Sequence, residues 1–308
     1  MTADPKPVPS LIAIDWGTTN RRGYLLNHEG IILDSYFDGD GLTNIRDGAY
    51  EASLKVLAAP WVAQWGLLPI LMSGMIGAST GWLDAGYCLV PVDSEGLSKE
   101  LVCVSKEKNI WIVPGVRTTD SSGNPDVIRG EEVQSLAIGG YSDQLMVVAP
   151  GTHSKWIHIQ DKSITGFTTF LTGDLFDAVL NHTIISVLND QAHVMNDDAF
   201  YRGVRAGFSE YQNLMHTLFS ARTNVLFKNL LPTEVSDYLS GLLIGGEIGS
   251  DLSEVGMTDA VFVLIGASDL TERYKLAFGA CEITAEIMNT DTVGKVYSGI
   301  ARSAGLVR

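Results

Sequence analysis

Two short turns in the 308-residue sequence carry residue types that bind phosphate. The first is Gly17-Thr18-Thr19-Asn20, which follows an apolar run ending in Asp15 and precedes the pair Arg21-Arg22. Glycine lets the backbone approach a ligand closely, and successive N–H groups in such a turn can form an anion-binding concavity. Its side chains add donors, an arginine adds positive charge, and Asp15 could hold Mg2+ directly or through water. Taken alone, the stretch is equally well explained as a hairpin loop whose Asp15 and threonines satisfy local backbone groups.

The second turn is Gly151-Thr152-His153-Ser154-Lys155, which offers backbone, hydroxyl and ammonium donors to another anion. Like the first, it lies between two apolar runs, so the two strand–turn–strand units predict two similar half-molecules. Neither turn matches a Walker A loop, and no dinucleotide fingerprint follows the first apolar run. Because phosphoryl transfer to an alcohol needs no imidazole, His153 is interpreted as a turn or phosphate-contact residue rather than a catalyst.

A third candidate is Leu264-Ile265-Gly266-Ala267, where an apolar run ends in glycine and small residues before a helical pattern. Such a turn could pack against a flat base or a ribose. Most glycines of this kind are simply strand-to-helix turns, and that is the alternative for Gly266.

Composition narrows the classes of partner. The formal net charge of −15 argues against a nucleic acid or an anionic membrane surface, because phosphates attract clustered Lys and Arg. No apolar run reaches the length of a membrane span, and the first ten residues lack the apolar core of a signal peptide. Three scattered cysteines argue against a disulfide framework or a zinc site and fit a reducing cytoplasm.

The turns must be positioned by strands and helices, and their mixture along the chain predicts an α/β fold. The apolar run 68–74 reads as a buried strand ending in glycine. After the turn-rich segment Arg117–Pro125, taken as a domain boundary, the pattern predicts a helix from Asp126 to about Ile138. The other expected elements are strands at 11–16, 23–26, 31–36, 259–270 and near 281–288, and helices at 44–58, 174–188, 199–217 and 233–250, from 271, and at 291–304.

Blocks along nearly the whole chain resemble the actin-like sugar kinases, most closely the 2-dehydro-3-deoxygalactonokinase family. Asp15-Trp16-Gly17-Thr18-Thr19, Gly151-Thr152-His153-Ser154 and Leu264-Ile265-Gly266-Ala267 occur in the order of that superfamily's two phosphate motifs and its adenosine motif. The similar blocks are AIDWGTTNRRGYLL, SGMIGASTGW, DVIRGEEVQ, APGTHSKW, FLTGDLFD, SGLLIGGEIG and LIGASDLTERY.

The resemblance implies two ribonuclease-H-like domains that face each other across a central cleft holding ATP. The expected division is a disordered tail at 1–10, domains at 11–122 and 123–290, and a helix at 291–308 that returns to the first domain. The implied reaction moves the γ-phosphoryl of ATP, with Mg2+, to the 6-hydroxyl of 2-dehydro-3-deoxy-D-galactonate in galactonate breakdown. The expected partners are the sugar acid and ATP, without nucleic acid or membrane, and the chain could form a homodimer.

The resemblance also implies a catalytic base. In the actin-like kinases it is usually an aspartate at the start of the helix that precedes the second phosphate turn, and Asp126 occupies that place in the expected helix. The alternatives are that Asp126 is an ordinary N-cap, or that Glu131, Glu132 or Asp174 is the base.

Candidate substrate contacts follow from the same blocks. Arg129, one turn along the expected helix from Asp126, could bind the substrate carboxylate bidentately, or it could pair with Glu132 or Asp126 within the helix. Ser73-Gly74-Met75 lies where related kinases place substrate contacts. Trp82 could form an apolar wall there, or it could be a buried tryptophan without ligand contact. Of the two adjacent arginines, Arg22 matches the family block and is expected on the phosphate side, whereas Arg21 would face solvent.

Three other functions fit parts of the sequence. An actin-like kinase for another sugar acid or polyol would differ only in its pocket. A non-catalytic sugar-sensing regulator of the same fold is disfavoured because about ten residues precede the first expected strand and the charge is acidic. A polymerising or chaperone-type ATPase is disfavoured because the chain is short for those roles.

Overall fold

The computed structural model of the protein describes residues 7–188, 195–255, 260–289 and 292–307, and its internal contacts divide it into two units. Unit 1 comprises Met1–Asp143, His158–Phe167 and Asn289–Arg308, and unit 2 comprises Gln144–Ile157 and Thr168–Met288. The division therefore lies further along the chain than the expected boundary at 122/123. Of the expected tail, residues 1–6 lie outside the described residues, and the first strand already begins at Pro9.

The first four strands of the two main sheets are arranged in the same order, which agrees with the two half-molecules expected from the turns. In each, the first strand lies between the second and the fourth, and it is parallel to the fourth. The order in the first sheet is β3 (Ile32–Asp38), β2 (Arg21–Asn27), β1 (Pro9–Trp16), β4 (Ile70–Ser73), β7 (Ile110–Ile112) and β6 (Val102–Ser105). The order in the second sheet is β12 (Ser163–Phe170), β11 (Ser154–Gln160), β10 (Gln144–Ala149), β13 (Val261–Leu264) and β14 (Ala285–Ile287).

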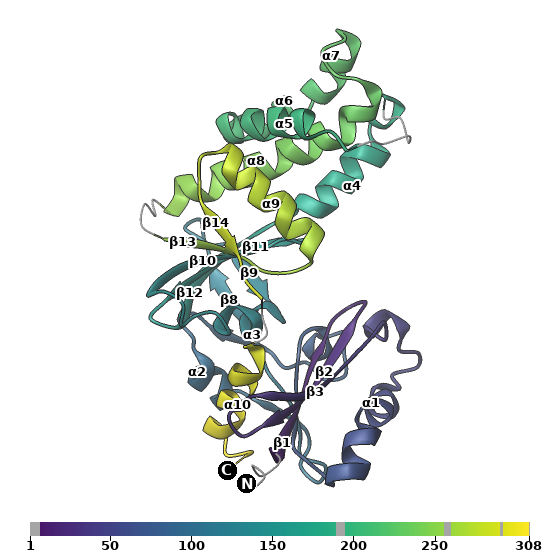
Figure 1. Cartoon of the computed structure of the whole chain (residues 1–308), viewed down its shortest axis with the longest axis vertical. Helices are drawn as coiled ribbons and strands as arrows, with labels where there is room; N and C mark the ends of the chain where they lie inside the picture. Colours follow the sequence, from purple (N-terminus) through teal and green to yellow (C-terminus); the bar gives the residue numbers. More distant parts are fainter. Residues whose placement is uncertain (1–6, 189–194, 256–259, 290–291, 308) are drawn as a thin grey trace, which may run out of the picture. The chain divides into compact units, whose positions relative to one another are not determined.

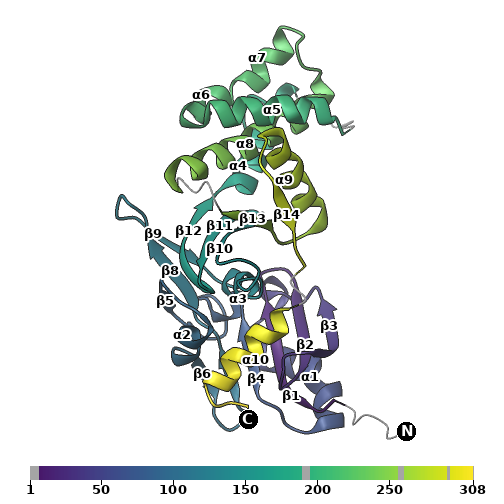
Figure 2. The same cartoon turned by 60° about the vertical axis from the view of Figure 1, so that its left-hand side comes forward.

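In unit 1 the sheet is covered by helices on both faces. Alternate residues of β1 point to opposite faces, and Ile12, Ile14 and Trp16 pack with α1 (Tyr50–Trp65). The C-terminal helix α10 (Val293–Ser303) lies across β1 and β2 on the other face (Figure 2). The carboxyl end of β1, which carries the first turn, is thereby held by a core on each side.

A small sheet of unit 1 corrects the expected helix at Asp126. It consists of β5 (Tyr87–Leu89), β8 (Gly115–Thr119) and β9 (Pro125–Ile128), and β8 and β9 form an antiparallel hairpin in which Thr118 pairs with Asp126. The turn-rich segment is thus a hairpin loop rather than a linker. The helix, α3 (Glu131–Leu136), begins only after Gly130, whose φ of +109° is unfavourable for other residues.

In unit 2, the helices α5 (Asp197–Ser209), α8 (Val235–Val255) and α9 (Ser268–Ala280) share one core with the sheet, and α5 packs across α8 (Figure 1). Glycines allow the close crossing: a Cβ built on Gly207 or Gly245 would lie about 2 Å from a carbonyl oxygen of the other helix (2.0 and 2.1 Å), and Gly203 and Gly241 are in the same situation. The two helix backbones are therefore in direct contact.

Most expected elements are confirmed as β1 to β4, β13, β14, α4 (Thr172–His182), α8, α9 and α10, with shifted ends. The helix expected at 44–58 begins at Tyr50, and the one at 199–217 is α5 followed by a break. The expected start of the last helix, residue 291, lies outside the described residues. The remaining elements are α2 (Ser94–Lys99), α6 (Leu214–Thr217), α7 (Ser220–Leu226) and 3-10 turns at Leu42–Asn44, Met75–Gly77, Ser186–Leu188, Tyr211–Asn213 and Pro232–Glu234.

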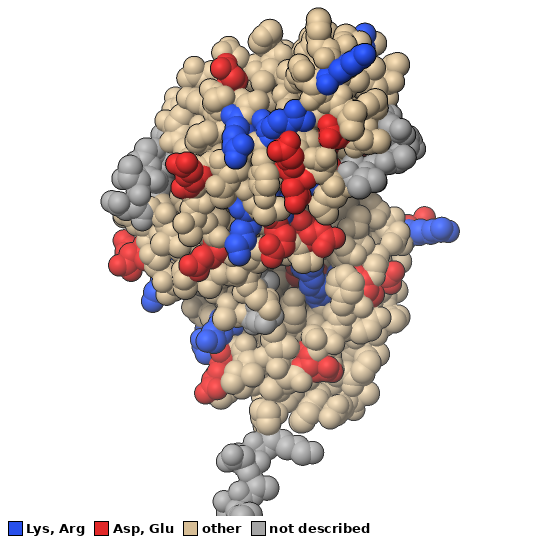
Figure 3. All heavy atoms as spheres, turned by 45° about the horizontal axis from the view of Figure 1, so that its top comes forward, with Lys and Arg blue, Asp and Glu red and all other residues tan. Residues whose placement is uncertain are grey.

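Two surface properties bear on partners. Within the described ranges, no helix combines the length and the apolar character that a bilayer span requires. On the face drawn in Figure 3, basic side chains are interspersed with acidic ones and form no continuous basic surface.

Candidate active site

The carbonyl groups of the first turn are hydrogen-bonded to a neighbouring loop, whereas two of its N–H groups have no partner among the described residues. The carbonyl oxygens of Gly17, Thr18 and Thr19 accept hydrogen bonds from the backbone of residues 41–43 at 3.0–3.1 Å. A Cβ on Gly41 would lie 2.3 Å from the Thr19 backbone, so only glycine permits this contact. Among the described residues, no acceptor faces the N–H groups of Thr18 and Thr19, which are exposed. This arrangement fits an anion, because free N–H groups on one turn concentrate positive potential.

Asp15 lies beside this turn at the end of β1, with three charged or polar neighbours. Its Oδ2 accepts a hydrogen bond from Gln134 Nε2 at 3.2 Å and is 3.6 Å from Arg22 Nη1. Burial raises the pKa of Asp15, the Arg22 charge and the Gln134 bond lower it, and the negative charge of Glu131 raises it again. The start of α3 therefore contributes both Gln134 and Glu131 to the surroundings of Asp15.

The donor set fits Mg2+ only together with phosphate. In the part of the chain that the structure describes, no group of three or more His, Cys, Asp or Glu side chains could hold a metal ion. Magnesium in kinases is usually held by one or two carboxylates together with substrate phosphates. One carboxylate, Asp15, next to a phosphate turn meets that requirement.

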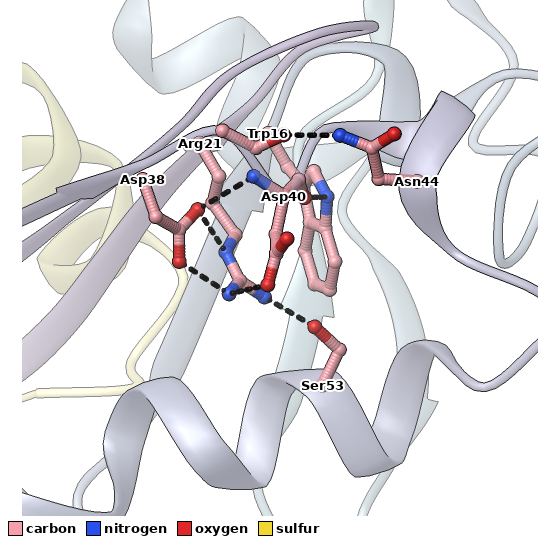
Figure 4. Close-up of polar contacts among 7 residues, drawn as sticks. Trp16, Arg21, Asp38, Asp40, Asn44 and Ser53 are labelled. Carbon is pink, nitrogen blue, oxygen red and sulfur yellow. Dashed lines mark hydrogen bonds and ion pairs between the residues drawn. The ribbon is translucent and has the colours of Figure 1, made fainter.

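The two adjacent arginines have opposite roles, and the expectation that Arg21 faces solvent is wrong. Arg21 is 1% exposed, donates to both Asp38 oxygens (3.2 and 2.7 Å) and to Ser53 Oγ (2.7 Å), and lies over the Trp16 ring at 4.7 Å (Figure 4). Arg22 is half exposed, and its Nη1 lies 3.6 Å from Asp15 Oδ2. Strand alternation explains the difference, because neighbours in β2 point to opposite faces.

We expect Arg21→Lys to lower the free energy of unfolding by about 2 kcal/mol. A lysine cannot bond both oxygens of Asp38 and Ser53 together, so buried acceptors lose their donors. Urea denaturation measures the change. Arg22→Lys, at the exposed neighbouring position, is the matched control and should change it by less than about 0.5 kcal/mol. Equal effects of the two substitutions would contradict the buried role of Arg21.

Arg129 is buried with free donors. Its side chain is 5% exposed, Nη2 donates to Gly86 O at 2.9 Å, and the guanidinium stacks on Tyr87 at 4.3 Å. Nε and Nη1 are buried without a hydrogen-bond partner among the described residues. Arg129 precedes the helix, so the expected pair with Glu132 or Asp126 would not be an intrahelical one; its side chain forms an ion pair with Asp84 at 4.0 Å. Buried donors of this kind indicate a bound water or a ligand anion.

Of the other expected substrate contacts, Ser73 is buried in the core, whereas Met75 and Trp82 are partly exposed. Ser73 is 1% exposed and its hydroxyl bonds to Tyr297 OH of α10 at 2.5 Å, which corrects its expected contact with substrate. Met75 is half-buried in the turn that leads to Gly77, where a Cβ would meet Arg129 Nη1 at 2.8 Å. Trp82 is half-buried and stacks on Tyr50, with centroids 6.3 Å apart. The turn that begins at Met75 therefore approaches Arg129 at Gly77, whereas Ser73 belongs to the core.

The position of Asp126 removes the reason for choosing it as the base. It lies in strand β9, where its Oδ1 accepts a hydrogen bond from the Val127 N–H at 2.7 Å. The carboxylate at the start of the helix is Glu131, which is half-buried and accepts from the Arg129 N–H at 3.0 Å. By the same rule of position, Glu131 takes the place that the sequence assigned to Asp126.

Glu132, a rival for the base, is fully buried instead. Its Oε2 accepts from the Gly130 N–H at 2.6 Å, Oε1 has no partner among the described residues, and burial raises the pKa of Glu132 to about 8. The side chain is therefore largely protonated at neutral pH. Its hydrogen bond with the Gly130 N–H stabilises the turn before α3.

We expect the pH dependence of stability to change in Glu132→Gln. Below the ordinary value of 4.5, this carboxyl is protonated in the folded and unfolded states. Between pH 4.5 and about 8 only the folded state keeps the proton, so the wild-type protein loses stability as pH rises, on the order of 3–4 kcal/mol. The variant lacks this loss, and thermal denaturation from pH 5 to 8 should show its Tm rising relative to wild type. A constant difference in Tm would contradict the burial of a neutral carboxyl.

The second turn, in unit 2, resembles the first in its free N–H groups. No described acceptor faces the N–H groups of Thr152 and His153, and Thr152 O accepts from the Asp174 N–H at 3.1 Å. His153 Nε2 lies 2.7 Å from Asp174 Oδ2, and Lys155 Nζ donates to His153 O at 3.2 Å. Asp174, a rival for the base, lies at the start of α4 and is thus paired with His153 of the second turn.

Ser154 corrects one expected phosphate contact. Its side chain is fully buried, and its hydroxyl donates to Glu247 at 2.6 Å in the core of unit 2. The expected contact of this hydroxyl with phosphate is therefore not available, while the turn before it is exposed.

A cavity of about 620 Å³ opens next to the second turn, and all of its lining residues belong to unit 2. Its walls are the turn at Gly151 and Thr152, the start of α4, and parts of α8 and α9. Gly266, with φ +133°, forms the strand-to-helix turn before α9 and approaches Pro150 O. The volume is within the range of cofactor sites in proteins.

A cluster of polar residues in this cavity was not predicted from the sequence. Arg273 of α9 donates to Asp237 Oδ1 and Ser240 Oγ of α8, each at 2.8 Å, and lies over Phe200 at 4.2 Å. Arg273 stands in the block that contains Gly266 and could have been found there. Asp237 and Ser240 carry no signal, because they are isolated polar residues in an apolar helix.

Comparison with known proteins gives a consistent result. The family model described as 2-keto-3-deoxy-galactonokinase matches residues 15–302. The 2-dehydro-3-deoxygalactonokinase of Escherichia coli (strain K12) is 35% identical over 277 residues, covering 89% of this chain and 91% of that protein. The Rhizobium meliloti (strain 1021) protein named "Probable 2-dehydro-3-deoxygalactonokinase DgoK1" is 31% identical over 301 residues, 95% of each chain. A crystal structure from Sinorhizobium meliloti, provisionally named for the same activity, has a TM-score of 0.85 at 30% identity and covers 96% of this chain and 98% of its own.

Proposed function

The chain belongs to the 2-keto-3-deoxy-galactonokinase family, and we propose from this how its own residues perform the reaction. It is a phosphotransferase with an alcohol group as acceptor, and it phosphorylates 2-dehydro-3-deoxygalactonate with ATP. The proposed acceptor is the 6-hydroxyl, so the products are the 6-phosphate and ADP, within the breakdown of D-galactonate. The observation that carries the proposal is the family match, which spans both turns and the Gly266 turn and so favours this kinase over the alternatives.

The phosphates of ATP are assigned to the two turns. Free N–H groups at Thr18 and Thr19 in unit 1, and at Thr152 and His153 in unit 2, support this assignment. Arg22 and Lys155 supply positive charge. We further propose that the units are two ribonuclease-H-like domains facing a central cleft.

Magnesium is assigned to Asp15 together with the phosphates. When bound, the ion neutralises charge on the phosphate oxygens. The protein's own contribution is to hold the carboxylate with Gln134 and Arg22, which fixes its orientation next to the first turn.

Glu131 is the proposed base that accepts the proton of the attacking hydroxyl. Its support is its position at the start of α3, its half-buried side chain and its influence on Asp15. A general base must lie beside the acceptor oxygen, so the substrate has to bind near the start of α3.

Arg129 is the proposed ligand of the substrate carboxylate. Its buried Nε and Nη1 have no partner among the described residues, and either one, together with the second N–H of Nη2, can supply the parallel pair of donors that a carboxylate accepts. Met75 and Trp82 would form apolar walls of the same pocket. Arg129 and Glu131 flank Gly130, so substrate binding and proton acceptance would take place on one short turn.

The cavity of unit 2 is the proposed nucleoside site. It has the volume for a base and ribose and borders the second turn, where the phosphates would continue. The Arg273–Asp237–Ser240 cluster forms part of its wall, and Gly266 precedes α9, which also contributes to the lining.

A cytoplasmic location and a homodimer belong to the same proposal. Cys88, Cys103 and Cys281 are free, which supports a reducing compartment. Exposed apolar side chains of unit 2, such as Met215 at 92% and Phe227 at 75%, are candidate contacts for a second copy.

A coupled ADP-release assay tests the proposed function. Purified protein is given ATP, Mg2+ and, in separate reactions, 2-dehydro-3-deoxygalactonate, other 2-keto-3-deoxy acids and common sugars and polyols. We expect turnover with 2-dehydro-3-deoxygalactonate, and NMR of the product should show phosphate on the 6-oxygen. Turnover of another sugar without turnover of any 2-keto-3-deoxy acid would overturn the proposal.

We expect Arg129→Lys to raise the KM for the sugar acid roughly 10- to 50-fold, because one ammonium cannot replace two parallel donors. The KM for ATP should change by less than twofold. Steady-state kinetics with each substrate varied in turn measures both. Arg117→Lys, on the exposed face of the neighbouring strand β8, is the matched control and should leave both values unchanged. An unchanged KM for the sugar acid in Arg129→Lys would remove Arg129 from the substrate site.

A further inference from the structure

Glu247 of α8 is a buried carboxylate that no step of the proposed reaction uses. It is 3% exposed, and four side chains donate to it. Oε1 accepts from Ser154 Oγ at 2.6 Å and from Trp156 Nε1 at 2.5 Å. Oε2 accepts from Tyr274 OH at 2.8 Å and from the Thr172 hydroxyl. Each oxygen therefore has two donors.

The four donors come from three elements, two of which line the nucleoside cavity. Ser154 is the residue at which the second turn enters β11, and Trp156 follows on the same face of that strand. Thr172 begins α4, and Tyr274 belongs to α9; both line the cavity. Together with α8 itself, one carboxylate thus connects four elements.

The chemistry of this cluster differs from ordinary core packing. Burial raises the pKa of Glu247, and the four hydrogen bonds lower it. None of the ion pairs found in the described part of the chain includes Glu247, so neutral donors alone balance the carboxylate. Burying a carboxylate costs free energy that burying an apolar side chain would not. In return, the carboxylate fixes the relative positions of the groups that donate to it.

We propose that Glu247 is a positioning residue for the nucleotide. It holds the second turn, the start of α4 and α9 at fixed separations, so that the turn's free N–H groups and the cavity fit the phosphate and nucleoside parts of one molecule. The proposal rests on the assignment of this turn and cavity to ATP.

Hydroxyl deletions around Glu247 test the proposal with little change in shape. Thr172→Val and Tyr274→Phe each remove one donor, and Glu247→Gln changes the acceptor. We expect the first two to raise the KM for ATP about 3- to 10-fold, the size of one hydrogen bond, and to leave the KM for the sugar acid within twofold. Thr172→Ser, which keeps the hydroxyl, should restore the wild-type KM for ATP.

Tyr238→Phe is the matched control. Tyr238 OH bonds to Ser220 Oγ at 2.9 Å and to Asn224 Nδ2 at 3.3 Å in the same unit, and Tyr238 is absent from the cavity lining. Its loss should leave both KM values unchanged even if stability falls, which separates a positioning effect from a general weakening of unit 2.

The outcomes are distinguishable from failure of the proposed function. Unchanged KM for ATP in Thr172→Val and Tyr274→Phe, or equal increases in both KM values, would overturn the role of Glu247 even if Glu247→Gln does not fold. If the wild-type protein turns over no 2-keto-3-deoxy acid, the proposed function fails, and titration calorimetry with MgATP still reads the positioning role. Absence of MgATP binding by the wild type would overturn both.

Discussion

Asp15→Asn is expected to lower kcat by about three orders of magnitude in a protein that remains folded. The loss corresponds to about 4 kcal/mol of transition-state stabilisation, as expected when the carboxylate that we propose as the ligand of Mg2+ becomes neutral. Asparagine has nearly the same shape and can still accept the Gln134 hydrogen bond. Because burial already disfavours the charged form of Asp15, the variant should be at least as stable as wild type.

Steady-state kinetics over a range of Mg2+ concentrations, with thermal denaturation in parallel, measures this result. Asp40→Asn is a suitable control, because the Asp40 side chain is exposed near the first turn and lies 3.6 Å from Arg21, while its hydrogen bonds to Trp16 and Asp38 use backbone atoms that the substitution keeps. A loss of less than tenfold in Asp15→Asn, at saturating Mg2+, would remove Asp15 from the catalytic centre.

Glu131→Gln is expected to lower kcat by about 10²- to 10⁴-fold, with KM values close to wild type. A glutamine can still accept the Arg129 N–H bond that Glu131 makes, but it cannot take a proton from the attacking hydroxyl. The acidic limb of the pH–rate profile should also disappear, since it reports protonation of the base.

Asp126→Asn is the control that separates the two assignments. If Asp126 is only a residue of the β8–β9 hairpin, its variant should keep near-normal turnover. Normal turnover in Glu131→Gln together with severe loss in Asp126→Asn would reverse the assignment of the base.

The error at Asp126 shows a limit of one-dimensional patterns. Asp126-Val127-Ile128 and the residues after it can be read as one helical stretch, and the first of them as its cap. Pairing with β8 makes the first part a strand instead, and that pairing depends on a partner nearby in space. The first meander was predicted because the turn between β2 and β3 was recognised as a hairpin turn, whereas the turn-rich loop between β8 and β9 was interpreted as a domain boundary.

Side-chain direction was predictable in part. Ser154 and Trp156 stand two residues apart in a strand, so they share a face, and a buried tryptophan implies a buried serine. For Arg21, strand alternation likewise indicates that it and Arg22 point to opposite faces. Its partner Asp38 could be identified only from the register of β2 with β3. The cavity of unit 2 could not be predicted, because its walls come from helices far apart in the chain.

The glycine contacts between α5 and α8 have a consequence for how this cavity can vary. Asp237, Ser240 and Glu247 all belong to α8, and the backbone of α8 is in direct contact with that of α5. An added methyl group at Gly207 or Gly245 would act as a wedge and displace all three side chains together. The absence of side chains at these glycines thus fixes the position of α8 and with it the width of the cavity. We therefore expect substitutions that alter nucleotide preference to occur in α4 and α9, while these glycines stay constant.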